Sequence, residues 1–167
     1  MADLSGHCAL HAVMGVGCGG RTGRLQDGGG CVVGLGGRKT GVADVVVTSF
    51  GFGHGAPPDA QVVLDLRLHF RDPHVDPVLR ELTVADRAVR RAVLRTPGIR
   101  PLLQATTAQV LAFRDGPSGE VVTVAVGCVG GRHRSATVAH FLARRLHRRG
   151  LAVDLVHRDA DRPVIRR

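Results

Sequence analysis

A glycine-rich turn between an apolar run and a basic segment carries the residues with the clearest capacity for chemistry. It reads Gly-Cys-Val-Gly-Gly-Arg-His-Arg-Ser over residues 127–135 and follows the β-branched run of residues 121–126. Glycines let backbone N–H groups converge, and a following helix adds unpaired N–H donors and the positive end of its dipole. Arg132 and Arg134 add planar guanidinium donors that match phosphate oxygens. The pattern predicts a phosphate-binding loop; the alternative is a glycine-rich connection whose arginines face water.

The same segment also satisfies the Cys-x5-Arg-Ser pattern of cysteine-dependent phosphatases, with Cys128 as nucleophile and Arg134 binding the phosphate. That chemistry needs a thiolate above a cradle of N–H donors and an Asp as general acid. Gly127 stands where these enzymes usually have His, and Asp72 is a speculative acid. A buried, unreactive Cys128 is therefore the preferred interpretation, and the chain is not expected to be an enzyme. A phosphatase is the alternative.

Positioning such a loop requires a strand before it and a helix after it. Strands are expected at residues 44–50, 60–68, 121–127 and 151–156, and helices at about 83–94, 99–113 and 134–149. The last strand, helix and strand form a βαβ unit. The order β-β-α-α-β-α-β therefore predicts a single α/β domain with helices packed on a mainly parallel sheet.

The first 42 residues stand apart from this pattern. Thirteen of the 23 glycines lie there, and neither helical nor strand periodicity runs through the segment. We expect residues 1–42 to form a disordered arm and residues 43–167 to form the domain. The spacing of four histidines and cysteines in the arm matches no compact zinc site: His7, Cys8, His11 and Cys18. Neither a metal nor a cofactor is therefore expected.

The chain is strongly basic, with a formal net charge of +9 over 167 residues. Ten arginines lie between residues 132 and 167, where only three aspartates oppose them. This concentration favours a nucleic acid as partner. The alternative is a solvated, arginine-rich surface that reflects coding bias. The predicted RNA-binding surface consists of residues from the last helix and the tail: Arg144, His147, Arg148, Arg158, Arg162, Arg166 and Arg167.

No segment approaches the roughly 18 to 20 apolar residues that a membrane span requires. The N-terminus also lacks the basic and apolar regions of a signal peptide. We therefore expect a soluble cytoplasmic protein with no membrane partner, whose four cysteines are reduced thiols.

Five short motifs occur in an order that resembles one known family. They are Ser-Phe-Gly-Phe-Gly-His-Gly at 49–55, Asp-Leu-Arg at 65–67, Asp-Pro-His at 72–74, the glycine-rich string at 127–135 and His-Arg-Asp at 157–159. With them the chain resembles the C-terminal domain of the RNase adapter RapZ family, from about Val45 to Asp159. The resemblance implies a lobe similar to phosphofructokinase-like proteins that binds an amino-sugar phosphate. In the best-known members the domain also binds small RNAs and presents them to an endoribonuclease.

The resemblance assigns the phosphosugar site to the glycine-rich loop and to one histidine from the Asp-Pro-His motif: Val129, Gly130, His133, Arg134 and His74. Their neighbours in the loop complete the predicted ligand site: Gly131, Arg132 and Ser135.

Departures from the family pattern limit what can be carried over. The family usually has Thr at position 129 and Asn at position 72, and the loop between Arg67 and His74 is one residue longer here. Typical members also carry an N-terminal P-loop domain that the residues before Val45 do not supply. We therefore do not expect the family's ATP or GTP binding here, and the oligomeric state, including a homo-oligomer, is left open.

Overall fold

Four apolar, β-branched runs become the parallel strands of a central sheet: β2 (Val45–Gly51), β3 (Val62–Asp65), β4 (Val122–Cys128) and β5 (Val153–His157). The computed structural model describes residues 31–35, 42–70, 82–163 and 165. The strand order across the sheet is β1-β5-β2-β4-β3. The predicted α/β domain with a mainly parallel sheet is confirmed.

The edge strand β1 (Cys31–Leu35) pairs antiparallel with β5 and lies inside the segment interpreted as an arm. The sequence did not predict this strand. A five-residue run between glycine-rich stretches has no periodicity of its own, and it is the backbone pairing with β5 that defines it. Residues 1–30 and 36–41 lie outside the described residues, so their assignment to an arm stays a prediction.

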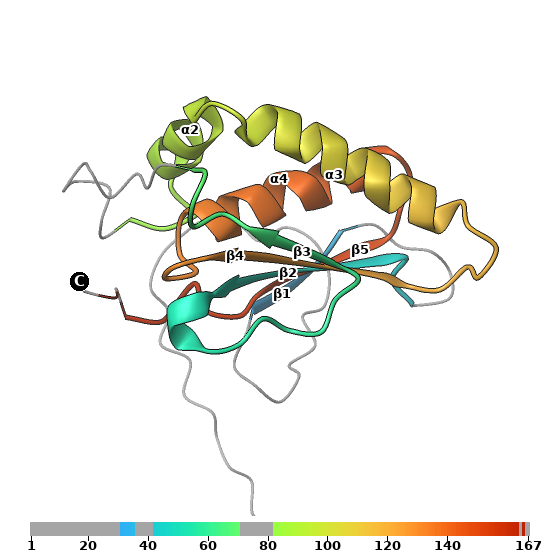
Figure 1. Ribbon diagram of the computed structural model, residues 1–167, viewed down its shortest axis with the longest axis horizontal. Helices are drawn as coiled ribbons and strands as arrows, with labels where there is room; N and C mark the ends of the chain where they lie inside the picture. The colour runs from blue at the N-terminus through green and yellow to red at the C-terminus, as the bar shows by residue number, and fades with distance from the viewer. Residues whose placement is uncertain (1–30, 36–41, 71–81, 164, 166–167) are drawn as a thin grey trace, which may run out of the picture.

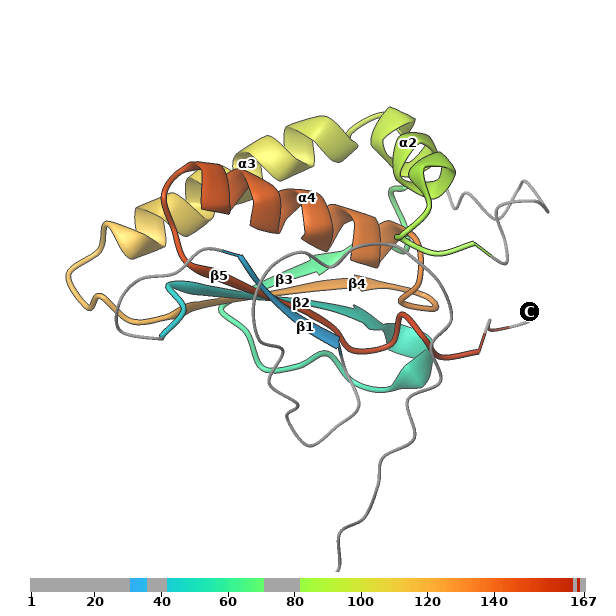
Figure 2. The same cartoon turned by 180° about the vertical axis from the view of Figure 1, so that it is seen from behind.

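Three helices pack on one face of the sheet: α2 (Arg87–Arg95), α3 (Ile99–Arg114) and α4 (Arg134–Arg148) (Figures 1 and 2). Side chains alternate between the two faces of a strand, and those that face the helices form an aliphatic core. Three residues on one face of α4 are fully buried in this core: Val138, Leu142 and Leu146. The strand residues packed in the same core are at most 2% exposed: Val45, Val47, Val124, Val126 and Leu155.

Two element boundaries differ clearly from the prediction, and local hydrogen bonds explain both. β3 ends at Asp65 instead of continuing to residue 68, because the Asp65 carboxylate accepts a hydrogen bond from the Arg67 backbone N–H at 2.9 Å and turns the chain. Thr83 does not begin α2. Its N–H donates to Asp86 Oδ2 at 2.8 Å, and this turn delays the helix to Arg87. The other predicted boundaries agree within two residues.

The parallel strands end at a common edge, which we call the carboxyl edge of the sheet. Pairing places Gly51 at the end of β2 opposite Cys128 at the end of β4, and Asp65 at the end of β3 opposite Gly127. The segments that follow these strands therefore meet beside one another. Ligands of open α/β sheets bind outside the carboxyl ends of the strands. The predicted loop, which follows β4, lies at this edge.

Candidate functional site

The glycine-rich loop, residues 129–133, is held closely against the end of β2. The Gly53 N–H donates to the Val129 carbonyl at 2.9 Å. A Cβ at Gly51 would lie 2.7 Å from the carbonyl carbon of Gly130 and 2.8 Å from the nitrogen of Gly131. Gly131 itself has a φ of +82°, which favours glycine. The close approach of the two segments therefore requires glycine at 51 and 131.

Gly130 differs from its neighbours because it faces open space. No described atom lies within 4 Å of the position that a Cβ would take at Gly130, and its φ is not in the left-handed region. Alanine is therefore compatible with the fold at this position. Gly130 marks the part of the loop that an incoming ligand can reach.

A buried carboxylate anchors the loop from the side of β5. Asp159 is fully buried, and its Oδ2 accepts a hydrogen bond from the Gly51 N–H at 2.8 Å. The guanidinium of Arg158 lies 2.8 Å from Oδ2, and Nε of Arg162 lies 3.1 Å from Oδ1. Two cations thus offset the cost of burying this charge. Arg158 also donates to the Ala56 carbonyl at 2.7 Å, which fixes the segment after β2.

Cys128 lies beneath the loop and is 4% exposed. Its Sγ accepts a hydrogen bond from the Gly131 N–H at 3.2 Å and lies 3.2 Å from Oγ of Ser135. A nucleophilic thiol must reach the phosphorus atom of a substrate, and this sulfur is covered by the loop. The prediction of a buried Cys128 is confirmed. Ser135, which was predicted to contact the ligand, is itself fully buried beside the thiol.

His133 and Arg134 tether the loop to other segments instead of pointing into open space. Arg134 is 4% exposed, and its Nη1 donates to the carbonyls of Leu66 at 2.8 Å and Phe70 at 2.7 Å. His133 is 3% exposed, and its Nε2 shares a hydrogen bond of 2.7 Å with the Leu82 carbonyl. The alternative in which the loop arginines simply face water is therefore wrong for Arg134. Both side chains thus bind the two segments that flank residues 71–81. His74, which was predicted to contact the ligand, lies outside the described residues.

Further cationic side chains surround the loop. Arg132 is half-buried and donates from Nη1 to the Arg162 carbonyl at 3.1 Å. Arg67 lies 3.6 Å above the ring of Phe52 and pairs with Asp65 at 2.6 Å. The hydrogen bonds from Arg67 hold the pKa of Asp65 below its ordinary value, so this carboxylate is ionised. This ion pair follows the end of β3 and borders the loop.

The imidazole of His54 lies close to the loop and has a buried nitrogen without a hydrogen-bond partner among the described residues. Nε2 of His54, in the short 3-10 helix η1 (Phe52–His54), is buried and makes no hydrogen bond with the described part of the chain. The preceding residue, Gly53, is the one bonded to the Val129 carbonyl. Buried polar groups in proteins are nearly always paired. A ligand atom or a water molecule at this position would satisfy His54.

The predicted RNA-binding residues fall into two separate groups. Arg144, His147 and Arg148 are exposed on the C-terminal half of α4, near the start of β5. Arg158 and Arg162 follow the end of β5, roughly 16 Å away along the strand, and both pair with Asp159. The described members of the predicted surface thus lie at the two ends of β5, and their role in RNA binding stays a prediction. The remaining two lie outside the described residues: Arg166 and Arg167.

The sequence analysis missed a basic cluster on α2. Four of the nine residues of this helix are arginines: Arg87, Arg90, Arg91 and Arg95. The signal was present in their spacing, which places them one turn apart. The basic surface was instead sought between residues 132 and 167, where the positive charge is most concentrated.

The fold and the loop define an α/β domain with a glycine-rich turn at the carboxyl edge of a parallel sheet. The family model described as the RapZ C-terminal domain matches residues 43–161, and the chain belongs to this family.

Similar proteins from several bacteria support this assignment. A nucleotide-binding protein of Rubrobacter xylanophilus is 46% identical over 135 residues, which cover 76% of this chain and 42% of the relative. Nucleotide-binding proteins of Thermobifida fusca and Thermus thermophilus are 42% and 44% identical over 119 residues, which cover 70% of this chain and 40% and 42% of the relatives. The chain spans about two fifths of the length of these relatives.

The names of these relatives describe binding and no enzymatic activity, which agrees with the interpretation of a non-enzymatic domain. Among the described residues, no helix is both long enough and apolar enough to cross a membrane.

Proposed function

We propose that this domain binds a phosphorylated small molecule in front of the loop at residues 129–133, with an amino-sugar phosphate as the first candidate. The observation that carries the proposal is the open position at Gly130, next to the start of the 15-residue helix α4. The first turn of α4 holds no acidic residue. Its N–H donors and the positive end of its dipole favour an anion at this place.

The charges around the loop support an anionic ligand. Three aspartates stand against five arginines at this edge: Asp65, Asp159 and Asp161 against Arg67, Arg132, Arg134, Arg158 and Arg162. Asp65 and Asp159 are paired with arginines, and the excess charge is positive. The buried Nε2 of His54 offers one further polar contact.

An amino sugar is the first candidate because the resemblance to the RapZ family implies it. Asp65 is the exposed, ionised carboxylate at the end of β3, and an ammonium group of the ligand would share it with Arg67. The relatives are named for nucleotides. This chain covers about two fifths of their length. We therefore do not propose a nucleotide as the ligand of this loop.

Calorimetry with a hexosamine phosphate, a hexose phosphate and inorganic phosphate tests the proposal. Gly130→Ala places a methyl group where the ligand approaches, and we expect it to weaken binding at least about tenfold while leaving the thermal midpoint unchanged. Asp65→Asn tests selectivity, because it should lower the affinity for the hexosamine phosphate more than the affinity for the hexose phosphate. Unchanged affinity in Gly130→Ala would place the ligand elsewhere.

A second candidate partner is structured RNA, contacted by the α4 basic group: Arg144, His147 and Arg148. The exposure of these side chains on one helix supports it, and the resemblance implies RNA with an endoribonuclease as a further partner. If the group contacts phosphates, removing Arg144 and Arg148 should flatten the dependence of log affinity on log salt by about two units. A gel shift that shows no binding at low salt would refute this candidate. A cytoplasmic location and a homo-oligomer stay predictions.

A further inference from the structure

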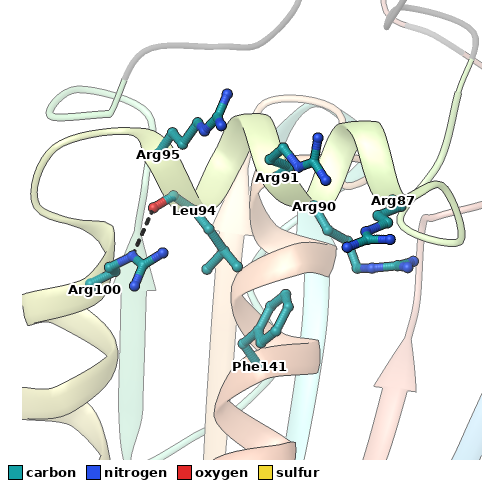
Figure 3. A pocket seen from close by; sticks show the side chains of 7 residues that line it. All are labelled: Arg87, Arg90, Arg91, Leu94, Arg95, Arg100 and Phe141. Atoms are coloured by element: carbon teal, nitrogen blue, oxygen red, sulfur yellow. Dashed lines mark hydrogen bonds between the residues drawn. The ribbon is translucent and has the colours of Figure 1, made fainter.

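A pocket lies where α2 meets α3 and α4, and it shares no residue with the glycine-rich loop. Its volume is about 410 Å³, and five arginines surround an apolar floor: Arg87, Arg90, Arg91, Arg95 and Arg100 around Leu94 and Phe141. Figure 3 shows Leu94 of α2 and Phe141 of α4 pointing toward one another, with the arginines around them. The volume falls within the range of small-molecule sites.

Hydrogen bonds fix two of the five guanidinium groups, one at each end of α2. Nη1 of Arg90 donates to the carbonyls of Val84 and Ala85, at 2.6 Å each. Nε of Arg100, on α3, donates to the Leu94 carbonyl at 3.4 Å. These two cations are therefore positioned by the protein before any ligand binds. Positioned donors lose less conformational entropy on binding than mobile ones.

The other three arginines repel one another without a described counter-charge. Arg87, Arg91 and Arg95 are exposed and follow each other at i and i+4, a spacing at which like charges destabilise a helix. No carboxylate of the described residues pairs with them, and the first turn of α2 contains no acidic residue. Within the described part of the chain these three cations have no paired anion, and a bound anion would stabilise them.

We propose that this pocket binds a small ligand that carries two or more adjacent phosphate groups. The stripe from Arg87 to Arg95 extends roughly 12 Å along the helix, which is too far for one phosphate to contact all of its members. A chain of phosphates can pair with several guanidinium groups in succession. The half-buried Leu94 and Phe141 form an apolar floor that suits a planar apolar group on the same ligand.

An apolar floor distinguishes this site from a surface that follows a nucleic-acid backbone. A backbone needs a track of positive charge along the surface, and exposed arginines alone would provide one. Here the arginines gather around a hollow that contains Leu94 and Phe141. A small oligophosphate fits this arrangement, and RNA is the competing occupant that the experiment must separate from it.

The test compares two matched double variants by calorimetry at low salt. Arg91→Gln with Arg95→Gln removes two charges from the pocket, and Arg145→Gln with Arg149→Gln removes two charges from the end of α4 that belong to neither proposed site. We expect tripolyphosphate to bind the wild-type chain and to lose at least about tenfold in affinity only in the first variant. Because glutamine keeps the helix propensity and the repulsion falls, the first variant should remain folded.

Adenosine triphosphate and tripolyphosphate distinguish the two sources of an oligophosphate. Tighter binding of the nucleotide, reduced by Phe141→Leu, supports a nucleoside oligophosphate, whereas equal binding supports the inorganic form at the same site. Gly130→Ala should bind both ligands as the wild type does, which separates this inference from the proposed loop function. Three results would overturn the inference: no binding at low salt, equal loss in both double variants, or binding of RNA alone that is lost in the first variant.

Discussion

Acid should destabilise this domain through one largely buried histidine, His157, at the end of β5. Its Nδ1 and the Ser49 hydroxyl of β2 share a hydrogen bond of 2.7 Å. Burial, together with the neighbouring His140, lowers the pKa of His157 to about 4. A histidine in an unfolded chain titrates near 6.5. The folded state therefore keeps this side chain neutral over a pH range in which the unfolded chain becomes charged.

The direction and the size of the effect follow from this difference. As the pH falls below about 6.5, the unfolded chain binds a proton that folded His157 does not bind, so the free energy of unfolding decreases until the pH reaches the folded pKa. At pH 4.5 the loss from this group amounts to roughly 2.5 kcal/mol relative to pH 7. Carboxylates titrate over the same range, so the contribution of His157 must be isolated by comparison with a variant.

Urea denaturation at pH 7 and pH 4.5 provides that comparison. His157→Asn replaces the imidazole with a neutral amide that can keep the contact with Ser49, and it should lose roughly 2.5 kcal/mol less than the wild type between the two pH values. The exposed His147 on α4 offers the control, because His147→Asn should behave as the wild type. An equal loss in His157→Asn and the wild type would refute the reasoning.

Three further predictions concern the loop. Arg134→Ala removes two buried hydrogen bonds to carbonyls and should lower the free energy of unfolding by roughly 3 kcal/mol, whereas Arg132→Ala should lower it less; urea denaturation measures both. Val129→Thr adds a hydroxyl donor beside the open position and should tighten phosphate binding by about two- to tenfold in calorimetry. Cys128→Ser should leave hydrolysis of an aryl phosphate at the level of the wild type, and turnover that this substitution abolishes would contradict a non-enzymatic domain.

The sequence was sufficient to predict the main strands and helices because their apolar residues recur with regular spacing. Short apolar, β-branched runs identified β2 and β4, and the basic segment after the glycine-rich turn was correctly assigned to α4. The strand β1 could not be found in this way. It is defined by hydrogen bonds to β5, more than 100 residues away, and its own five residues carry no period.

The candidate site shows the same limit at the level of single side chains. Residue type and spacing correctly predicted a glycine-rich turn between β4 and α4. They did not predict that Arg134 is bonded to carbonyls in the segment after β3. An arginine next to glycines has the same appearance in sequence whether it binds a ligand or a distant carbonyl, because only the tertiary fold decides which acceptor it meets.

The contacts around the loop indicate how a site can form with few side chains that reach the ligand directly. The Gly53 N–H binds one end of the loop, Asp159 holds the neighbouring end of β2, and Arg134 fixes the beginning of α4. The shape of the loop is thus set by segments that follow three different strands. A ligand that meets N–H donors already held in place loses less affinity to the ordering of the protein. In the proposed site, the buried tethers would contribute to binding through the geometry of the backbone. Substitutions there should therefore change stability and affinity together, whereas Gly130→Ala should change affinity alone.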